Sequence, residues 1–163
     1  MAAVKAVPEG FGTVSASLVV PNAMEAMAYY EKAFGAEPGM RMAGPDGGST
    51  MHAEMRIGTS TIMLTDENPR WNMRSPSSLG GSPMSLHLYV EDADALFQRA
   101  VEAGCEVEYD IMDAFWGDRY GKVRDPFGYT WGIASHREDL SEAQIADRQR
   151  EWFRQFADSG GAG

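Results

Sequence analysis

The sequence predicts an α+β protein built from two similar βαβββ modules, each made of a strand, a helix and three further strands. Both halves of the chain show a strand-like run, then a capped helix, then a glycine that ends the helix, then further strands. The second half repeats the first at a fixed offset of 70 residues, since Ser85 matches Ser15 and Val90 matches Val20. Each module leaves one sheet face bare, so the two sheets can curl around a shared concavity.

The first module begins with a strand rich in β-branched residues at positions 13–20. Asn22 and Glu25 have the spacing of a helix-capping pair, and Gly35 ends the helix that they begin. A connection with a short strand around residues 40–43 follows.

A hairpin completes the first module, with strands at 51–57 and 60–65 joined by a two-residue turn at Gly58 and Thr59. This register places Glu54 opposite Met63. One face of the hairpin is almost entirely apolar and must pack on helices. His52, Glu54 and Arg56 therefore point to the opposite side of the sheet.

A long Pro-, Gly- and Ser-rich loop leads into the second module, where a strand at 84–90 precedes a helix from Asp92 to Gly104. A strand at 105–109 and a final hairpin around Asp125-Pro126-Phe127-Gly128 follow. The expected divisions are an N-terminal extension (1–12), a first module (13–66), a linker (67–83), a second module (84–136) and a C-terminal helix with tail (137–163), in one globular domain overall.

The stretch FWGDRYGKVRDPFGYTW is the densest cluster of aromatic, charged and glycine residues in the chain. Period-two alternation places Trp116, Asp118 and Tyr120 on one strand face, provided that Val123 packs on helices. His87 and Tyr89 alternate in the same way on the strand before them. Such a face is typical either of a ligand cavity or of an exposed sheet surface, and the hairpin alone does not separate the two.

The C-terminal segment predicts a helix from Ser141 to about residue 157, because Ser141 and Gln144 form a capping box. Its apolar stripe must dock on this subunit or on another one. The stripe comprises Ile145, Trp152, Phe153 and Phe156.

Composition excludes several classes of function. With Lys+Arg 14 against Asp+Glu 24 the net charge is −10, which disfavours nucleic acid and anionic membranes as partners. No apolar run approaches the roughly 20 residues of a spanning helix, and the first residues do not form a signal peptide. The single cysteine, Cys105, cannot form an internal disulfide. We expect a cytoplasmic protein.

The segments AYYEKAFGAE, HAEMRIG, SLHLYVEDADALF and FWGDRYGKVRDPFGYTW resemble the glyoxalase/bleomycin-resistance/extradiol-dioxygenase (vicinal oxygen chelate) superfamily, in particular its PhnB-like branch. The resemblance covers about residues 13–139. It implies the glyoxalase-like fold, in which two βαβββ modules form an open, cup-shaped, barrel-like sheet. It also implies a homodimer and a small-molecule site in the cup. Members include metal-dependent isomerases, dioxygenases, thiol transferases and proteins that sequester antibiotics.

The resemblance also locates the metal ligands of the metal-binding members, at Ser15, Met63, Ser85 and Gly132 in this chain. None of these side chains is a credible ligand for a divalent cation, which requires imidazole, thiolate or carboxylate groups. We therefore expect no cofactor and no metal at the usual positions. The alternative is a divalent metal at a displaced site formed by His52, Glu54 and His87.

Two functions from different classes remain. The first is a non-catalytic binding protein, whose cup holds a cationic or aromatic small molecule. Its ligand-binding candidates are Arg56, Met63, Tyr89, Trp116, Asp118 and Tyr120, with Glu54 as a further acidic group. The second is an enzyme, a lyase, isomerase or dioxygenase-like protein, with His52, Glu54 and His87 as acid–base groups or metal ligands. A purely structural alternative pairs Glu54 with Arg56 or Arg119 and makes His87 a half-buried strand histidine.

Overall fold

The structure, a computed structural model, describes residues 4–158. The first half contains β1 (Ser17–Val20), α1 (Ala23–Phe34), β2 (Glu37–Ala43), β3 (Thr50–Ile57) and β4 (Ser60–Asp66). A 3₁₀ turn η1 (Pro69–Trp71) and a short helix α2 (Pro76–Leu79) lie in the linker. The second half contains β5 (Ser85–Tyr89), α3 (Ala93–Ala103), β6 (Glu106–Asp113), β7 (Asp118–Arg124) and β8 (Thr130–His136), and α4 (Glu142–Asp158) follows.

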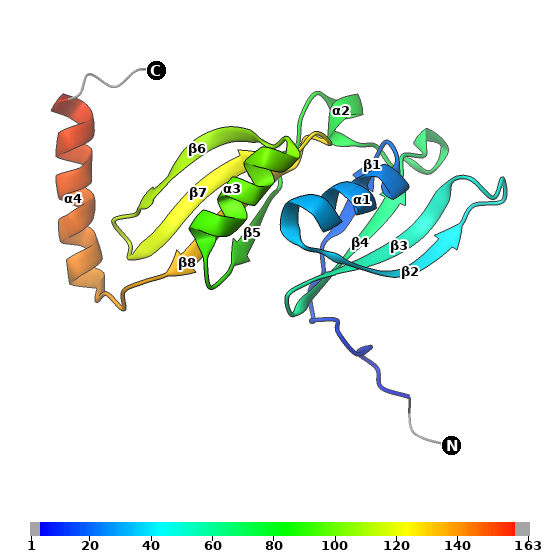
Figure 1. Cartoon of the computed structure of the whole chain (residues 1–163), viewed down its shortest axis with the longest axis horizontal. Coiled ribbons are helices and arrows are strands. Elements are labelled where there is room, and N and C mark those ends of the chain that lie inside the picture. Colours follow the sequence, from blue (N-terminus) through cyan, green and yellow to red (C-terminus); the bar gives the residue numbers. More distant parts are fainter. Residues whose placement is uncertain (1–3, 159–163) are drawn as a thin grey trace.

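The strands form two separate open four-stranded sheets with the same topology (Figure 1). Their orders are β1-β4-β3-β2 and β5-β8-β7-β6. In each sheet the first strand runs parallel to the last one, and the other neighbours are antiparallel. This repetition confirms the predicted α+β fold with two βαβββ modules.

Local signals in the sequence account for the helix ends and the turns. The Asn22 side chain accepts hydrogen bonds from the backbone N–H groups of Met24 and Glu25, and Gly35 adopts the left-handed conformation that ends α1. In the final hairpin the N–H of Gly128 donates to the carbonyl of Asp125 at 3.1 Å, which closes the predicted turn.

The predicted hairpin register in the first module is confirmed. Ile57 pairs with Ser60, and Glu54 pairs with Met63. Ala53 and Met55 are fully buried under α1, whereas Glu54 and Arg56 point away from the helix. The same alternation in β7 buries Val123 under α3 and turns Tyr120 to the open face.

Several predicted element boundaries were wrong. The strand expected around residues 40–43 begins at Glu37, and the strand expected at 105–109 continues to Asp113. Trp116 is not a strand residue, because β6 and β7 are joined by a turn at residues 114–117 that ends in Gly117 at φ 100°. The long loop is partly ordered by η1 and α2.

The modules are joined through an aromatic and polar core between α1 and the end of the second sheet. Trp131 of β8 is completely buried, and its ring centroid lies 5.4 Å from that of Tyr30 and 4.4 Å from that of Phe34 on α1. The Tyr30 hydroxyl and the Trp131 Nε1–H both donate to Asp125 Oδ2, at 2.7 and 2.9 Å. Burial raises the pKa of Asp125, although its hydrogen bonds oppose that shift.

Two further contacts cross the junction. The Tyr129 hydroxyl lies 3.0 Å from both the backbone N–H and the carbonyl of Val19 in β1. The Arg99 guanidinium on α3 donates to the carbonyls of Glu31 and Lys32 in the last turn of α1, where the Glu31 carbonyl also accepts from the Gly35 N–H. Helices α1 and α3 thus lie side by side over their own sheets, and the opposite face of each sheet stays open (Figure 1).

Helix α4 stands beside the second module, apart from the two sheets (Figure 1). Its predicted capping box is confirmed by the reciprocal hydrogen bonds between Ser141 and Gln144. Trp152 contacts Phe115 with ring centroids 5.9 Å apart, whereas the Phe153 side chain is exposed. The side chain of Phe156 lies outside the described residues. Within residues 4–158, no helix has the length and apolarity needed to cross a membrane.

Candidate functional site

The open face of the second sheet carries a stacked pair of rings. The imidazole of His87 on β5 and the phenol of Tyr120 on β7 lie with centroids 5.8 Å apart and planes 8° apart. Gly132 of β8 lies beneath them, since a Cβ there would approach His87 Nδ1 to 2.8 Å and the Tyr120 ring to 3.1 Å. The absence of a side chain at Gly132 is therefore what allows both rings to lie against the strand.

Beside this pair the aromatic residues enclose a hollow of about 150 Å³. Its walls are inclined to one another, with the Trp116 and Tyr120 centroids 5.4 Å apart at 62°, and Trp152 of α4 forms part of the lining. Such a hollow suits a compact apolar or aromatic group. It is lined by Tyr109, Met112, Phe115, Trp116, Tyr120, Lys122 and Trp152.

The buried carboxylate of Asp118 holds two aromatic side chains in place through hydrogen bonds. Its side chain is 3% exposed and accepts hydrogen bonds from the Tyr89 hydroxyl at 3.0 Å, Trp116 Nε1–H at 2.9 Å and His136 Nδ1 at 2.8 Å. Burial pushes the pKa of Asp118 up, but the hydrogen bonds from His136, Trp116 and Tyr89 outweigh burial and hold it below its usual value. The ionised carboxylate therefore fixes the orientation of Trp116 and Tyr89.

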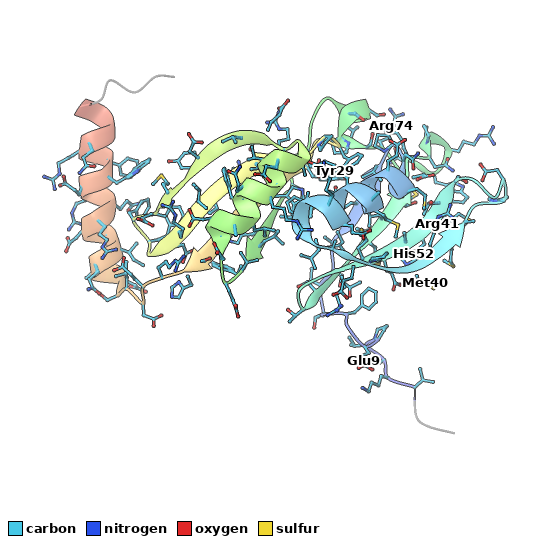
Figure 2. All side chains as sticks on the ribbon, in the orientation of Figure 1. Glu9, Tyr29, Met40, Arg41, His52 and Arg74 are labelled. Carbon is cyan, nitrogen blue, oxygen red and sulfur yellow. The ribbon has the colours of Figure 1, made fainter. Side chains whose placement is uncertain are left out.

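The open face of the first sheet carries a separate polar pair. His52 Nε2 lies 3.1 Å from Glu54 Oε1, and the two side chains are about a quarter exposed, at 26% and 23%. Figure 2 shows His52 on this sheet, at the end of the molecule away from α4. Glu54 does not pair with either arginine of the structural alternative, because Arg56 contacts Glu37 and Arg119 contacts Asp94.

The sequence-predicted residues therefore fall into two sets. His87, Tyr89, Asp118 and Tyr120 come together on the second sheet, and Trp116 joins them from the turn before β7 rather than from a strand. His52, Glu54, Arg56 and Met63 lie on the first sheet. No hydrogen bond or ring contact within residues 4–158 joins one set to the other. The roles assigned to these residues stay predictions.

Several residues of the site were not among those predicted from the sequence. Lys122 shares the alternation of Tyr120, and Tyr109 lies on the neighbouring β6, so pattern alone could have included both. Trp152 could not be assigned to the site from the sequence, because no pattern near it shows where α4 packs. His136 was also missed, since its partner Asp118 is 18 residues away on the adjacent strand.

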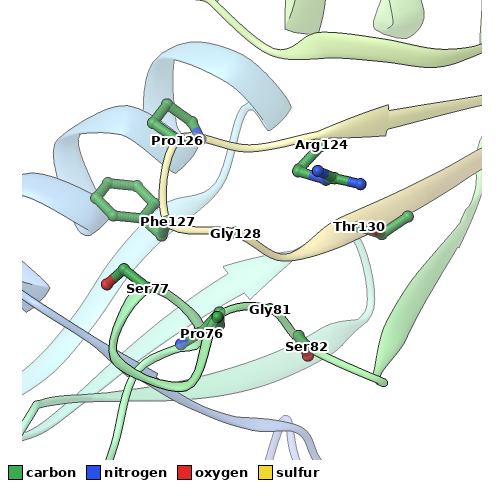
Figure 3. A pocket seen from close by; sticks show the side chains of 10 residues that line it. Pro76, Ser77, Gly81, Ser82, Arg124, Pro126, Phe127, Gly128 and Thr130 are labelled. Atoms are coloured by element: carbon green, nitrogen blue, oxygen red, sulfur yellow. The ribbon is translucent and has the colours of Figure 1, made fainter.

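Other hollows lie elsewhere on the described residues. One of about 280 Å³ lies between residues 14–16, the Gly58-Thr59 turn and residues 86–90, and so shares His87 and Tyr89 with the aromatic residues of the second sheet. Another of about 340 Å³ lies between residues 76–82 of the linker and the turn that contains Gly128 (Figure 3). Neither is lined by Trp116, Tyr120 and Trp152.

The duplicated fold and its open sheet faces agree with comparison to known sequences. The sequence pattern of the Glyoxalase/Bleomycin resistance protein/Dioxygenase superfamily matches residues 12–133. The chain belongs to this superfamily. A Mycobacterium bovis protein, Mb0911c, is 43% identical to this chain over 135 residues, covering 81% of this chain and 88% of the relative.

Solved structures of the superfamily's fold superpose on most of the chain. TioX from Micromonospora sp. ML1 is 23% identical with a TM-score of 0.59, covering 77% of this chain and 99% of TioX. The fosfomycin resistance protein FosX from Listeria monocytogenes, solved with Mn(II) and sulfate, is 14% identical with a TM-score of 0.58, covering 85% of this chain and 97% of FosX. At these identities the likeness concerns the fold alone.

At the four positions that the sequence resemblance assigns to metal ligands, the side chains do not fit a divalent cation. Ser15 and Ser85 offer only hydroxyls, Met63 a thioether, and Gly132 no side chain at all. The space above Gly132 is taken by the rings of His87 and Tyr120. Within the described part of the chain, no three His, Cys, Asp or Glu side chains group closely enough to hold an ion.

Protein that is mixed with zinc, nickel or manganese and then dialysed is therefore expected to retain well below one equivalent of metal. Elemental analysis measures this directly. One equivalent retained would contradict the expectation. Loss of that ion in both His52→Ala and His87→Ala would then locate it at the displaced site.

Proposed function

We propose that the protein binds a small organic molecule, with an aromatic or compact apolar group held in the hollow of the second module. The observation that carries the proposal is the set of inclined rings that form this hollow. Large rings supply most of the binding energy at small-molecule and protein interfaces, because they remove much apolar surface from water. Superfamily membership supports a ligand site on the open sheet faces.

The rings of this site are held in place before any ligand arrives. Asp118 fixes Trp116 and Tyr89 through hydrogen bonds, and Gly132 lets Tyr120 and His87 lie flat on the sheet. Phe115 and Trp152 support the outer edge. A wall whose side chains are already ordered loses little conformational entropy on binding, so more of the contact energy appears as affinity.

Trp116→Ala is expected to weaken ligand binding by about 2 kcal/mol or more, because it removes a central wall of the hollow. Trp116→Phe keeps a ring but not the N–H that donates to Asp118, and its ligand affinity should fall less than that of Trp116→Ala. Trp71→Ala is the matched control, since Trp71 is 61% exposed and does not line the hollow. Calorimetric titration with a panel of aromatic compounds gives the affinities. Equal affinities for wild type and Trp116→Ala would refute this site.

A homodimer is the second part of the proposal. Each sheet leaves one face open, and a second copy could bring the His52–Glu54 pair of its first module to the aromatic wall. We expect light scattering at micromolar concentration to give twice the mass of the 17.8 kDa chain. A monomer under these conditions would remove this part of the proposal without affecting the hollow.

A further inference from the structure

The charges around the hollow differ from those that the sequence suggested. The acidic residues Asp118 and Glu54 favoured a cationic ligand. In the structure Asp118 is 3% exposed and already accepts three side-chain hydrogen bonds. Glu54 lies on the other sheet, against His52. Neither carboxylate is placed to pair with a cation inside the hollow of the same chain.

Among the described residues that line the hollow, Lys122 alone carries a charge at neutral pH. It projects from β7 on the same face as Tyr120, and its side chain is 37% exposed. Lys122 Nζ lies 3.2 Å from Glu108 Oε2, so the ammonium group stands at the rim while the alkyl stem covers apolar surface.

The ion pair of Lys122 belongs to a small cluster of charges on the second sheet. Glu108 is shared between Lys122 and Arg124, so this cluster holds two cations and one carboxylate, although Arg124 does not itself line the hollow. Burial pushes the pKa of Glu108 up, but contacts with Arg124 and Lys122 hold it below its usual value, so Glu108 is ionised at neutral pH. This cluster at the edge of the hollow therefore carries one net positive charge, in a protein whose net charge is −10.

We propose that the ligand of this hollow is an aromatic carboxylate, with its ring among Trp116, Tyr120 and Trp152 and its carboxylate at the Lys122 ammonium. A hollow of about 150 Å³ is small for a drug-sized molecule and suits a single ring. The charge-assisted hydrogen bond to Lys122 supplies the selectivity. This inference rests on the proposed function, because it names the ligand class of the same site.

Three probes of matched shape separate ring binding from charge selection: phenylacetate, 2-phenylethanol and 2-phenylethylammonium. Affinities are measured by the shift of the Trp116 indole N–H resonance in NMR, assigned with Trp116→Phe, at 0.15 M salt where remote charges are screened beyond about 8 Å. We expect phenylacetate to bind about tenfold more tightly than 2-phenylethylammonium, with 2-phenylethanol between them. The net charge of the protein would give the opposite order.

Two variants change the rim in opposite directions. Lys122→Met keeps the apolar stem and should weaken phenylacetate binding about fivefold, while 2-phenylethanol changes less than about twofold. Glu108→Gln releases Lys122 and Arg124 and should strengthen phenylacetate binding. Lys32→Met, at an exposed position on α1 that does not line the hollow, is the control. If the two variants acted only by disturbing the fold, both would weaken phenylacetate binding, so affinity changes of opposite sign indicate an effect of charge.

The outcomes distinguish the two proposals. If 2-phenylethanol binds but the cation binds most tightly, or if Lys122→Met leaves phenylacetate affinity unchanged, the ligand class is wrong and the binding site stands. If none of the three probes shifts the Trp116 resonance, the proposed function fails and the inference fails with it.

Discussion

Replacing Asp125 by asparagine is expected to lower the free energy of unfolding by about 3 kcal/mol, because all four partners of this buried carboxylate are donors. The Tyr30 hydroxyl and Trp131 Nε1–H donate to Oδ2, while the backbone N–H groups of Phe127 and Tyr129 donate to Oδ1. Asparagine offers one acceptor oxygen, and its NH₂ group would face donors. The hydroxyl can rotate away, but the indole cannot.

Urea unfolding followed by circular dichroism measures this loss. Asp110→Asn is the matched control, since Asp110 is an exposed residue of β6, and it should stay within about 0.5 kcal/mol of the wild type. A loss below about 1 kcal/mol in Asp125→Asn would show that the network does not hold the modules together as the geometry indicates.

Trp131→Ala is expected to cost about 3–5 kcal/mol, because it removes the largest fully buried side chain of the chain's described core. The cavity would open between Tyr30 and Phe34 on α1, and the Asp125 carboxylate would lose one of its donors. Trp71→Ala, at a ring that is 61% exposed, is the comparison and should change stability little.

Combining Asp125→Asn with Trp131→Ala measures how far the stabilising effect of each residue depends on the other. Asp125 and Trp131 share a hydrogen bond, so the double variant should lose less stability than the sum of the single ones. Strict additivity in the urea measurements would mean that the two residues act independently.

The fold was largely predictable because local patterns specify it. Asn22, Gly35 and the Gly58-Thr59 turn set element ends and a hairpin register by chemistry that is visible within a few residues. The same alternation gave the correct face for His87 and Tyr120. Trp116 was misplaced, because its alternation with Asp118 continues through a turn in which strand geometry no longer applies.

The candidate site was less predictable because it depends on contacts between distant elements. Trp152 reaches the hollow from α4, and the buried Asp118 carboxylate is satisfied by Tyr89 on β5 and His136 on β8. The sequence shows that Asp118 is acidic, but not that its carboxylate is saturated with donors. For that reason the acidic residues in the sequence favoured a cationic ligand, whereas the ligand proposed from the structure is anionic.

The contacts of the Asp125 turn have a consequence for how the chain is synthesised and folds. Arg99 donates to two carbonyls in the last turn of α1, and the Tyr30 hydroxyl donates to Asp125, 95 residues further along the chain. The amino-terminal half thus leaves the ribosome before the partners of its aromatic face have been made. It completes its core only after the final hairpin has been made, so the halves should unfold in a single cooperative transition, and neither should be stable when expressed without the other.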